Sequence, residues 1–132
     1  AKLQQELQQL QKQALLVEAK AWIATQEKRQ SSYLIKRHDQ SDVKGLRALM
    51  DVLKDLKKEW MFVLYSVQDN QLSLMVSVPK NLQEKAPAAN DLIKHLCERG
   101  GGRPDFAQGG GLLANDFHQK IAALEEKLST SL

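Results

Sequence analysis

Residues 61–79, MFVLYSVQDNQLSLMVSVP, are the most informative stretch for the fold, because they predict two strands and the turn between them. The first seven residues are almost continuously apolar, which is typical of a strand buried on both faces. The QDNQ segment that follows predicts a turn, since Asp and Asn tolerate left-handed backbone conformations. Apolar residues then alternate with Ser73 and Ser77, which predicts a strand with one wetter face, and Pro79 ends it.

A shorter strand and a helix are predicted directly before this hairpin. YLIKR, residues 33–37, is a short β-type run. Ser41 or Asp42 can cap a following helix, because their side-chain oxygens accept hydrogen bonds from the free N–H groups of the first turn. A strand, a crossover helix and a hairpin together predict a mixed sheet with helices packed on it. The apolar face of the helix consists of Val43, Leu46, Leu49, Met50, Leu53 and Leu56.

Two more helices are predicted after the hairpin. Pro87 suits the first turn of one helix, and Asn115 or Asp116 can cap the other. Between them, residues 106–108 can form one short edge strand. The expected fold class is α+β: a long N-terminal helix followed by a small mixed β-sheet with packed helices. The buried stripes that we expect are Ala89, Leu92, Ile93 and Leu96 in the first helix, and Phe117, Ile121, Leu124 and Leu128 in the second.

The first thirty residues form one long helical pattern without glycine or proline. Its apolar residues alternate at spacings of four and three, the a/d seam of a coiled coil. One interpretation is a helix that packs on its own globular domain or on a neighbouring one, and the other is self-association into a homodimer. Trp22 and Ile23, at and beside the alanine-rich part of the seam, can also dock the globular part. The seam consists of Leu3, Leu7, Leu10, Ala14, Val17, Ala21 and Ala24.

This pattern divides the chain into a helical linker or coiled-coil segment, residues 1–31, and a globular domain, residues 32–132. The 132 residues leave room for one domain of typical size. The chain begins Ala-Lys-Leu-Gln, without an initiator methionine and inside the helical pattern. We therefore expect it to be a piece of a longer protein.

The composition argues against several classes of protein. Hydrophobic residues make up 42% and charged residues 27% of the chain, as in ordinary soluble domains. The net charge of +3 is mildly basic and permits binding to nucleic acid. The single cysteine, Cys97, excludes an intrachain disulfide framework and suits a reducing cytosol. No apolar run approaches the ~20 residues of a membrane span, and no basic-then-apolar leader is visible, so we expect a cytoplasmic protein without a membrane partner.

Catalytic and metal-binding patterns are missing from the sequence. His38, His95 and His118 are far apart, and no His-x-x-x-His pair occurs. Cys97 has only His95 nearby, and positions i and i+2 of a helix do not face each other, which favours a buried apolar role for the thiol. Neither a nucleophile elbow nor a phosphate-binding Gly-x-x-x-x-Gly-Lys-Ser/Thr loop is present. We therefore expect a noncatalytic chain with no metal or cofactor of its own.

Six of the seven glycines fall within GGGRPDFAQGGG, residues 100–111. One interpretation is an anion site, in which successive backbone N–H groups point into one concavity and Arg103 grips a phosphate. The other interpretation is tight packing of a helix and a strand against glycine backbone. Arg103 can also tie down the loop through Asp105. The cations nearby in sequence, which would extend a positive field, are Lys94, Arg99 and Lys120.

The string GGGRPDFAQGG, residues 100–110, resembles the signature of the DHHA1 domain, and more narrowly that of the C-terminal domain of bacterial alanyl-tRNA synthetases. SDVKGLR, residues 41–47, resembles that family's acidic-x-Lys-x-Leu-Arg helix start. The resemblance covers roughly residues 32–128, and the long helix resembles the linker that precedes the domain. CER, residues 97–99, replaces the Gly-Gly-Lys/Arg that is frequent in the family, which predicts a less open bend and a less positive local charge.

The resemblance implies a noncatalytic RNA-binding domain. In such synthetases it contacts the outer corner of the L-shaped tRNA and helps the aminoacylation and editing sites act on the same tRNA. The implied partners are alanine tRNA and the catalytic and editing domains of the same chain, and the implied parent is an alanine–tRNA ligase that uses ATP, magnesium and zinc. The candidate RNA-binding residues are Gly100, Gly101, Gly102, Arg103, Gln108, Gly109, Gly110, Lys94 and Arg99.

Two other interpretations remain open. Related domains accompany DHH phosphoesterases, where the glycine loop helps hold a nucleotide or nucleic-acid substrate. The chain has no DHH triad, and its Arg-Pro-Asp continuation favours the synthetase. The remaining interpretation is a dimerisation module built on the first helix.

Overall fold

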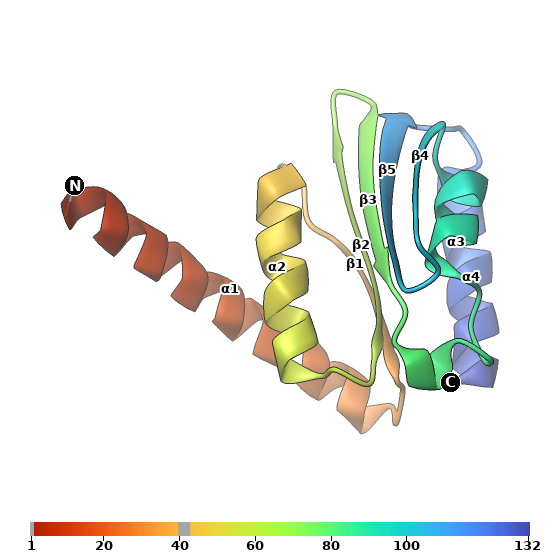
Figure 1. Cartoon of the computed structure of the whole chain (residues 1–132), viewed down its shortest axis with the longest axis horizontal. Helices are drawn as coiled ribbons and strands as arrows, with labels where there is room; N and C mark the ends of the chain where they lie inside the picture. The colour runs from red at the N-terminus through yellow and green to blue at the C-terminus, as the bar shows by residue number, and fades with distance from the viewer. Residues whose placement is uncertain (1, 40–42) are drawn as a thin grey trace.

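The computed structural model describes residues 2–39 and 43–132. The expected α+β class is confirmed, because a long N-terminal helix precedes a small mixed sheet on which further helices pack (Figure 1). The predicted helix caps Ser41 and Asp42 lie outside the described residues. In chain order, the elements are α1 (Lys2–Lys28), β1 (Tyr33–Arg37), α2 (Val43–Leu56), β2 (Met61–Gln68), β3 (Gln71–Ser77), η1 (Lys80–Leu82), α3 (Ala89–Leu96), β4 (Arg99–Gly102), β5 (Phe106–Leu112) and α4 (Phe117–Ser131).

Within the described residues, the sheet has five strands in the order β1-β2-β3-β5-β4. β1 runs parallel to β2 across the α2 crossover, and the other neighbouring strands are antiparallel. The predicted hairpin is β2–β3. Asp69 and Asn70 at its turn have φ values of 52° and 62°, the left-handed conformations that such a tight turn requires.

Helices cover both faces of the sheet (Figure 1). On one side, α1 and α2 form a buried cluster with alternate sheet residues such as Phe62 and Met75. On the other side, α3 and α4 form a second cluster with Val63 and Leu74. Because β2 is covered on both faces, it needs apolar residues at nearly every position, as the continuous run at residues 61–67 predicts.

α1 docks on the globular part through the face that carries Ala19 and Ile23. Both residues are buried in the same cluster as α2, and Trp22 packs against that cluster. Gln26 Nε2 donates a 2.7 Å hydrogen bond to the carbonyl of Tyr33, which joins the end of α1 to β1. The expectation that Trp22 and Ile23 dock the globular part is therefore confirmed.

The a/d seam of α1 is exposed. Leu7, Leu10 and Val17 are 58%, 62% and 69% exposed, while the side chain of Leu3 lies outside the described part. The N-terminal part of α1 projects away from the sheet (Figure 1). Self-association along this seam, and the division of the chain at residue 31, stay predictions. No helix in the described ranges has both the length and the apolar character needed to cross a membrane.

The glycine-rich segment forms two strands where the sequence predicted a loop and one short edge strand. Residues 106–108 belong to the seven-residue β5, which lies inside the sheet between β3 and β4. The edge strand is β4, and it consists of an arginine and three glycines. The prediction was wrong because glycine has low strand propensity and no side chain whose alternation could indicate a strand. Pairing with β3 and packing of α3 order this segment instead.

Candidate nucleic-acid interface

The glycine window folds into the β4–β5 hairpin. Arg99 pairs with Gly110 and Gly101 with Gln108, and the N–H of Arg103 donates a 2.8 Å hydrogen bond to the carbonyl of Phe106 at the turn. A nest requires consecutive N–H groups that point to the same side, whereas those of a strand alternate between its two edges. The strand geometry of the hairpin therefore argues against a nest of this kind, and binding of an anion to these residues stays a prediction.

Several glycines of the hairpin are required by packing. A Cβ added to Gly100 or Gly109 would lie 2.7 Å from Cγ2 of Ile93, so α3 packs directly on the backbone of both strands. A Cβ added to Gly110 would lie 2.5 Å from the carbonyl oxygen of Leu72 on β3. The interpretation that glycines allow a helix and a strand to pack closely is confirmed for Gly100 and Gly109, while Gly110 allows close approach of the neighbouring strand β3.

Gly101 has no such packing requirement. Within the described part of the chain, a Cβ added to Gly101 would have no atom within 4 Å apart from those of Gly101 and its two chain neighbours, and the φ of Gly101 is outside the left-handed region. Gly101 faces the same side of the sheet as its cross-strand neighbour Gln108, and this is the side on which Phe106 packs toward α2. Neither backbone conformation nor internal packing therefore requires glycine at this position.

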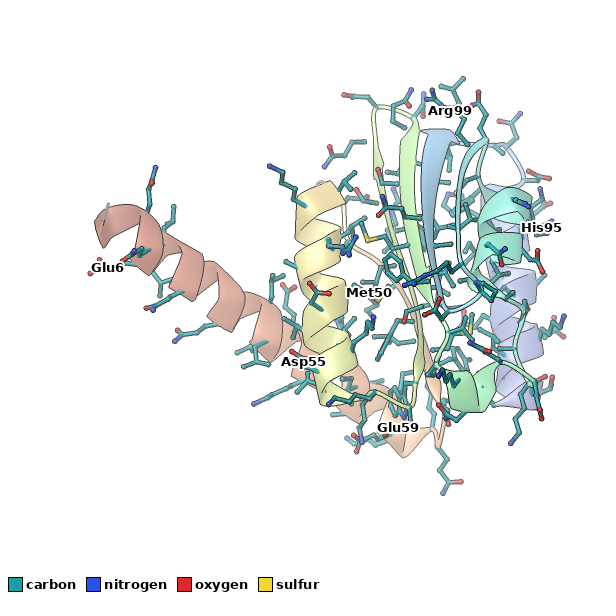
Figure 2. The ribbon with its side chains drawn as sticks, viewed as in Figure 1. Glu6, Met50, Asp55, Glu59, His95 and Arg99 are labelled. Atoms are coloured by element: carbon teal, nitrogen blue, oxygen red, sulfur yellow. The ribbon has the colours of Figure 1, made fainter. Side chains whose placement is uncertain are left out.

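A shallow groove of about 440 Å³ lies over β3, β5 and β4 and is bordered by Val43 at the start of α2. Ser73 and Gln108 contribute polar side chains, and much of its floor is glycine backbone. Arg99 lies at the end of the sheet where β4 begins (Figure 2). The predicted site residues that line this groove are Arg99, Gly100, Gln108, Gly109 and Gly110.

The other predicted residues lie along the hairpin or elsewhere. Gly102 ends β4 beside the turn. Arg103 is in the turn, where its side chain is 79% exposed and its Nε lies 3.4 Å from Oδ1 of Asp105. Lys94 is exposed on α3, which packs on the opposite side of the sheet. The structure thus places Arg99 and Arg103 at opposite ends of β4 and separates Lys94 from the groove.

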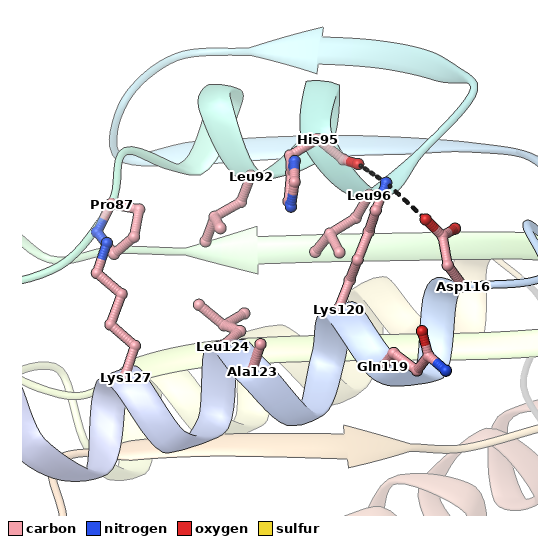
Figure 3. Close-up of a pocket in the computed structure, with 10 residues that line it drawn as sticks. All are labelled: Pro87, Leu92, His95, Leu96, Asp116, Gln119, Lys120, Ala123, Leu124 and Lys127. Atoms are coloured by element: carbon pink, nitrogen blue, oxygen red, sulfur yellow. Dashed lines mark hydrogen bonds and ion pairs between the residues drawn. The ribbon is translucent and has the colours of Figure 1, made fainter.

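A second hollow of about 360 Å³ lies between α3 and α4, with Leu92 and Leu124 among its apolar walls (Figure 3). Lys120 reaches across this hollow. Its Nζ donates a 3.2 Å hydrogen bond to the carbonyl of His95 and lies 3.6 Å from the carboxylate of Asp116. Lys120 therefore joins the end of α3 to α4. Its position in the sequence suggested that it extends the positive field of the hairpin, but its ammonium group is directed to His95 and Asp116 instead.

Cys97 lies between α3 and β4, packed against the core on that side of the sheet. Burial raises the pKa of its thiol to about 11, so the thiol is protonated at neutral pH and is a poor nucleophile. This supports the interpretation of Cys97 as an apolar packing residue. In residues 2–39 and 43–132, no three His, Cys, Asp or Glu side chains are placed to hold a metal ion.

Residues 30–130 match the family model of the DHHA1 domain. The chain belongs to this family. Among solved structures, it is similar to the C-Ala domain of alanyl-tRNA synthetase from Aquifex aeolicus, with a TM-score of 0.56 and 30% identity over 74% of this chain and 88% of that one. The resemblance of the glycine string to the C-terminal domain of alanyl-tRNA synthetases is therefore confirmed.

Alanine–tRNA ligases are among the relatives of this DHHA1 domain. The ligase of Legionella pneumophila strain Corby is 38% identical over 95 residues, which cover 72% of this chain and 11% of the ligase. The ligase of Fusobacterium nucleatum is 39% identical over 134 aligned positions, which cover 95% of this chain and 15% of the ligase. The chain thus spans between 11% and 15% of the length of these relatives.

The candidate residues chosen from the sequence omitted α2, which borders the groove of this DHHA1 domain. Lys44, Arg47 and Lys54 recur at spacings of three and seven residues, which place them on one side of the helix. That periodicity was the available signal. It pointed to the site only once the fold had placed Arg47 and Lys54 of α2 over Phe106 of β5.

Proposed function

We propose that this domain is the noncatalytic, tRNA-binding C-terminal domain of an alanine–tRNA ligase. In this proposal it contacts the corner of alanine tRNA and helps the catalytic and editing domains of the same chain act on one tRNA. The similarity to the C-Ala domain and to several ligases supports this parent. ATP, magnesium and zinc would serve the catalytic and editing domains, and the protein would be cytoplasmic.

The observation that carries the proposal is the open surface at Gly101. A Cβ there would have no atom of the described chain within 4 Å beyond its own chain neighbours, so internal packing does not require glycine at this position. A ligand that approaches the main chain closely does need it, because a side chain would hold that ligand away. RNA is such a ligand, since many protein contacts to nucleic acids are hydrogen bonds from backbone and polar groups to phosphate and sugar.

The charges around the groove support RNA as the ligand. Arg99 lies at one end of β4, and the exposed Lys44 is in the first turn of α2 beside Val43. Affinity for nucleic acid depends largely on such cations meeting phosphates, and it falls steeply with salt. Aromatic residues make up only 5% of the chain, which favours contacts with a folded RNA shape over stacking on many unpaired bases.

The test is a titration of labelled tRNA with the whole chain at two salt concentrations. We expect weak binding that favours folded tRNA over an unstructured RNA of the same length and that weakens strongly at the higher salt. Equal affinity for both RNAs would contradict recognition of shape. A dissociation constant that does not change with salt would contradict the electrostatic account.

A homodimer through α1 is a second candidate function, favoured by the exposure of the seam at Leu7, Leu10 and Val17. The same seam can contact other domains of the ligase instead. Sedimentation of the chain over a range of concentrations distinguishes the two, with Leu10→Glu as the variant that should abolish self-association. A sedimentation coefficient that is independent of concentration and equal in both proteins would contradict the dimer.

A further inference from the structure

Two cations of α2 lie over the ring of Phe106 on β5. The guanidinium carbon of Arg47 is 5.1 Å, and the ammonium nitrogen of Lys54 is 5.5 Å, from the ring centroid. Both distances are within the ~6 Å reach of a cation–π interaction. Phe106 is half-buried and packs against the hydrophobic cluster that contains the buried residues of α2. Two positive groups from residues two helical turns apart on α2 therefore lie close to the same ring.

The Phe106 ring and its two cations lie next to the groove. Phe106 and Gln108 are two residues apart on β5 and face the same side of the sheet, and Gln108 lines the groove. α2 packs against β2 and β3, so β5 and β4 extend beyond it on this face. Arg47 and Lys54 therefore lie over Phe106 on the same face of the sheet as the groove, next to its lining residue Gln108.

Neither cation is neutralised by an acid in the described part of the chain. No ion pair shorter than 4.0 Å involves Arg47 or Lys54 there. Asp51 lies between them on α2, but it is exposed and makes no such pair with either of them within the described residues. Two like charges near one ring repel each other. An anion that binds both relieves this repulsion.

We propose that Arg47 and Lys54 form a clamp for the phosphate backbone of RNA, with Phe106 as their positioning residue. This inference rests on the proposed tRNA binding and adds two cations beside the groove to the proposed contact surface. A nucleic-acid strand suits the clamp because its negative charges repeat along the chain, so two separate cations can each meet a phosphate. Arg47 can bind phosphate oxygens in bidentate fashion, while Lys54 acts as a point charge.

The test replaces both cations by methionine, Arg47→Met with Lys54→Met. Methionine keeps an unbranched apolar stem over the Phe106 ring and removes the charge. Titration of labelled tRNA at several salt concentrations should show a loss of affinity of roughly tenfold or more at low salt. The plot of log affinity against log salt should become shallower by about 1 for each cation removed. Melting temperatures close to that of the unmodified chain show that the fold is retained.

The matched control is Lys85→Met with Lys127→Met, which removes the same charge from the turn before α3 and from α4, at two positions that do not line the groove. It should leave affinity and salt slope nearly unchanged.

Phe106→Leu retains both cations but not the aromatic ring beneath them, and should weaken binding without changing the salt slope. Binding of the double methionine variant that equals that of the unmodified chain would overturn the clamp and leave the proposed function standing. An equal loss of tRNA affinity in the control variant would also overturn the clamp. Absence of tRNA binding by the unmodified chain would overturn both the clamp and the proposed function.

Discussion

The carboxylate of Glu98 accepts a hydrogen bond from the backbone N–H of Leu112, with 3.0 Å between Oε2 and the nitrogen. Glu98 directly precedes β4 and Leu112 ends β5, so this bond fastens the open end of the hairpin. Gly111 leaves room for it, because a Cβ added there would lie 2.7 Å from Cβ of Glu98. Glu98, which departs from the family's glycine pattern, therefore stabilises the hairpin through its hydrogen bond with Leu112.

Glu98→Ala should lower the stability of the domain by about 1 kcal/mol, because the lost bond has a charged acceptor but lies in an exposed position. Thermal melting at neutral pH measures this change. Glu98→Gln keeps an acceptor oxygen and should lose less. A melting temperature of Glu98→Ala equal to that of the unmodified chain would show that the bond contributes nothing.

Asp39 joins β1 to β2. Its carboxylate accepts hydrogen bonds from Nε of Arg37 at 2.9 Å and 2.8 Å, and from the N–H of Val67 at 2.9 Å. The bond from Arg37 and then that from Val67 hold the pKa of Asp39 below its usual range. A carboxyl group whose pKa is lowered by folding stabilises the fold above its unfolded pKa, and this stabilisation is lost as the pH falls through the folded pKa.

Asp39→Asn should therefore lower the melting temperature at pH 7. The difference from the unmodified chain should shrink below about pH 4, where the unfolded carboxyl begins to bind its proton. Melting curves across this pH range measure the effect. Asp55→Asn, on the exposed face of α2, is the matched control for the loss of one carboxyl group. A difference for Asp39→Asn that stays constant with pH would contradict the prediction.

The sequence predicted those parts of the fold whose side chains show a period. The buried residues of α3 and α4 are the predicted stripes, and Asp69 and Asn70 form the predicted turn. α1 shows where periodicity is insufficient. Its regular seam is exposed, while Ala19 and Ile23 dock on α2, because a helix with small apolar residues on more than one side does not reveal which side has a partner.

The candidate site was harder to predict, since neighbours in sequence need not be neighbours in space. Lys94 and Lys120 flank the glycine window in the sequence, yet both lie on helices across the sheet from the groove. Arg47 and Lys54 come more than forty residues earlier, and only the crossover through α2 brings them to Phe106. The three-dimensional fold, rather than a local motif, places these charges.

Gly101→Leu separates the function of the hairpin from its folding. A Cβ at position 101 meets open space and the φ of Gly101 is not left-handed. The melting temperature should therefore stay the same or rise, because the unfolded chain loses conformational freedom. Affinity for tRNA should fall, because the side chain occupies the space that the RNA backbone needs. Melting curves and tRNA titrations on the same protein measure both effects.

The control for this variant is Gly100→Leu, one residue earlier. Gly100 has a φ of 141°, and an added Cβ would lie 2.4 Å from Cα of Gly109. This substitution should destabilise the domain strongly, because neither strand can move without losing the packing of α3. A loss of stability in Gly101→Leu comparable to that in Gly100→Leu, or unchanged tRNA affinity of Gly101→Leu, would remove the main support for the hairpin as an RNA contact.

Arg103→Ala decides between the two roles that the sequence left open for this arginine. Three main-chain hydrogen bonds hold the turn, so it does not depend on the guanidinium. The N–H of Arg103 donates to the carbonyl of Phe106, that of Val78 to the carbonyl of Asp105, and that of Ala89 to the carbonyl of Pro104. The contact with Asp105 is 3.4 Å long and exposed, and such pairs contribute little. We therefore expect a change in stability within about 0.5 kcal/mol and a loss of tRNA binding of roughly 1–3 kcal/mol, the scale of a hydrogen bond to a charged group. A lower melting temperature with unchanged affinity per folded molecule would assign Arg103 to the turn instead.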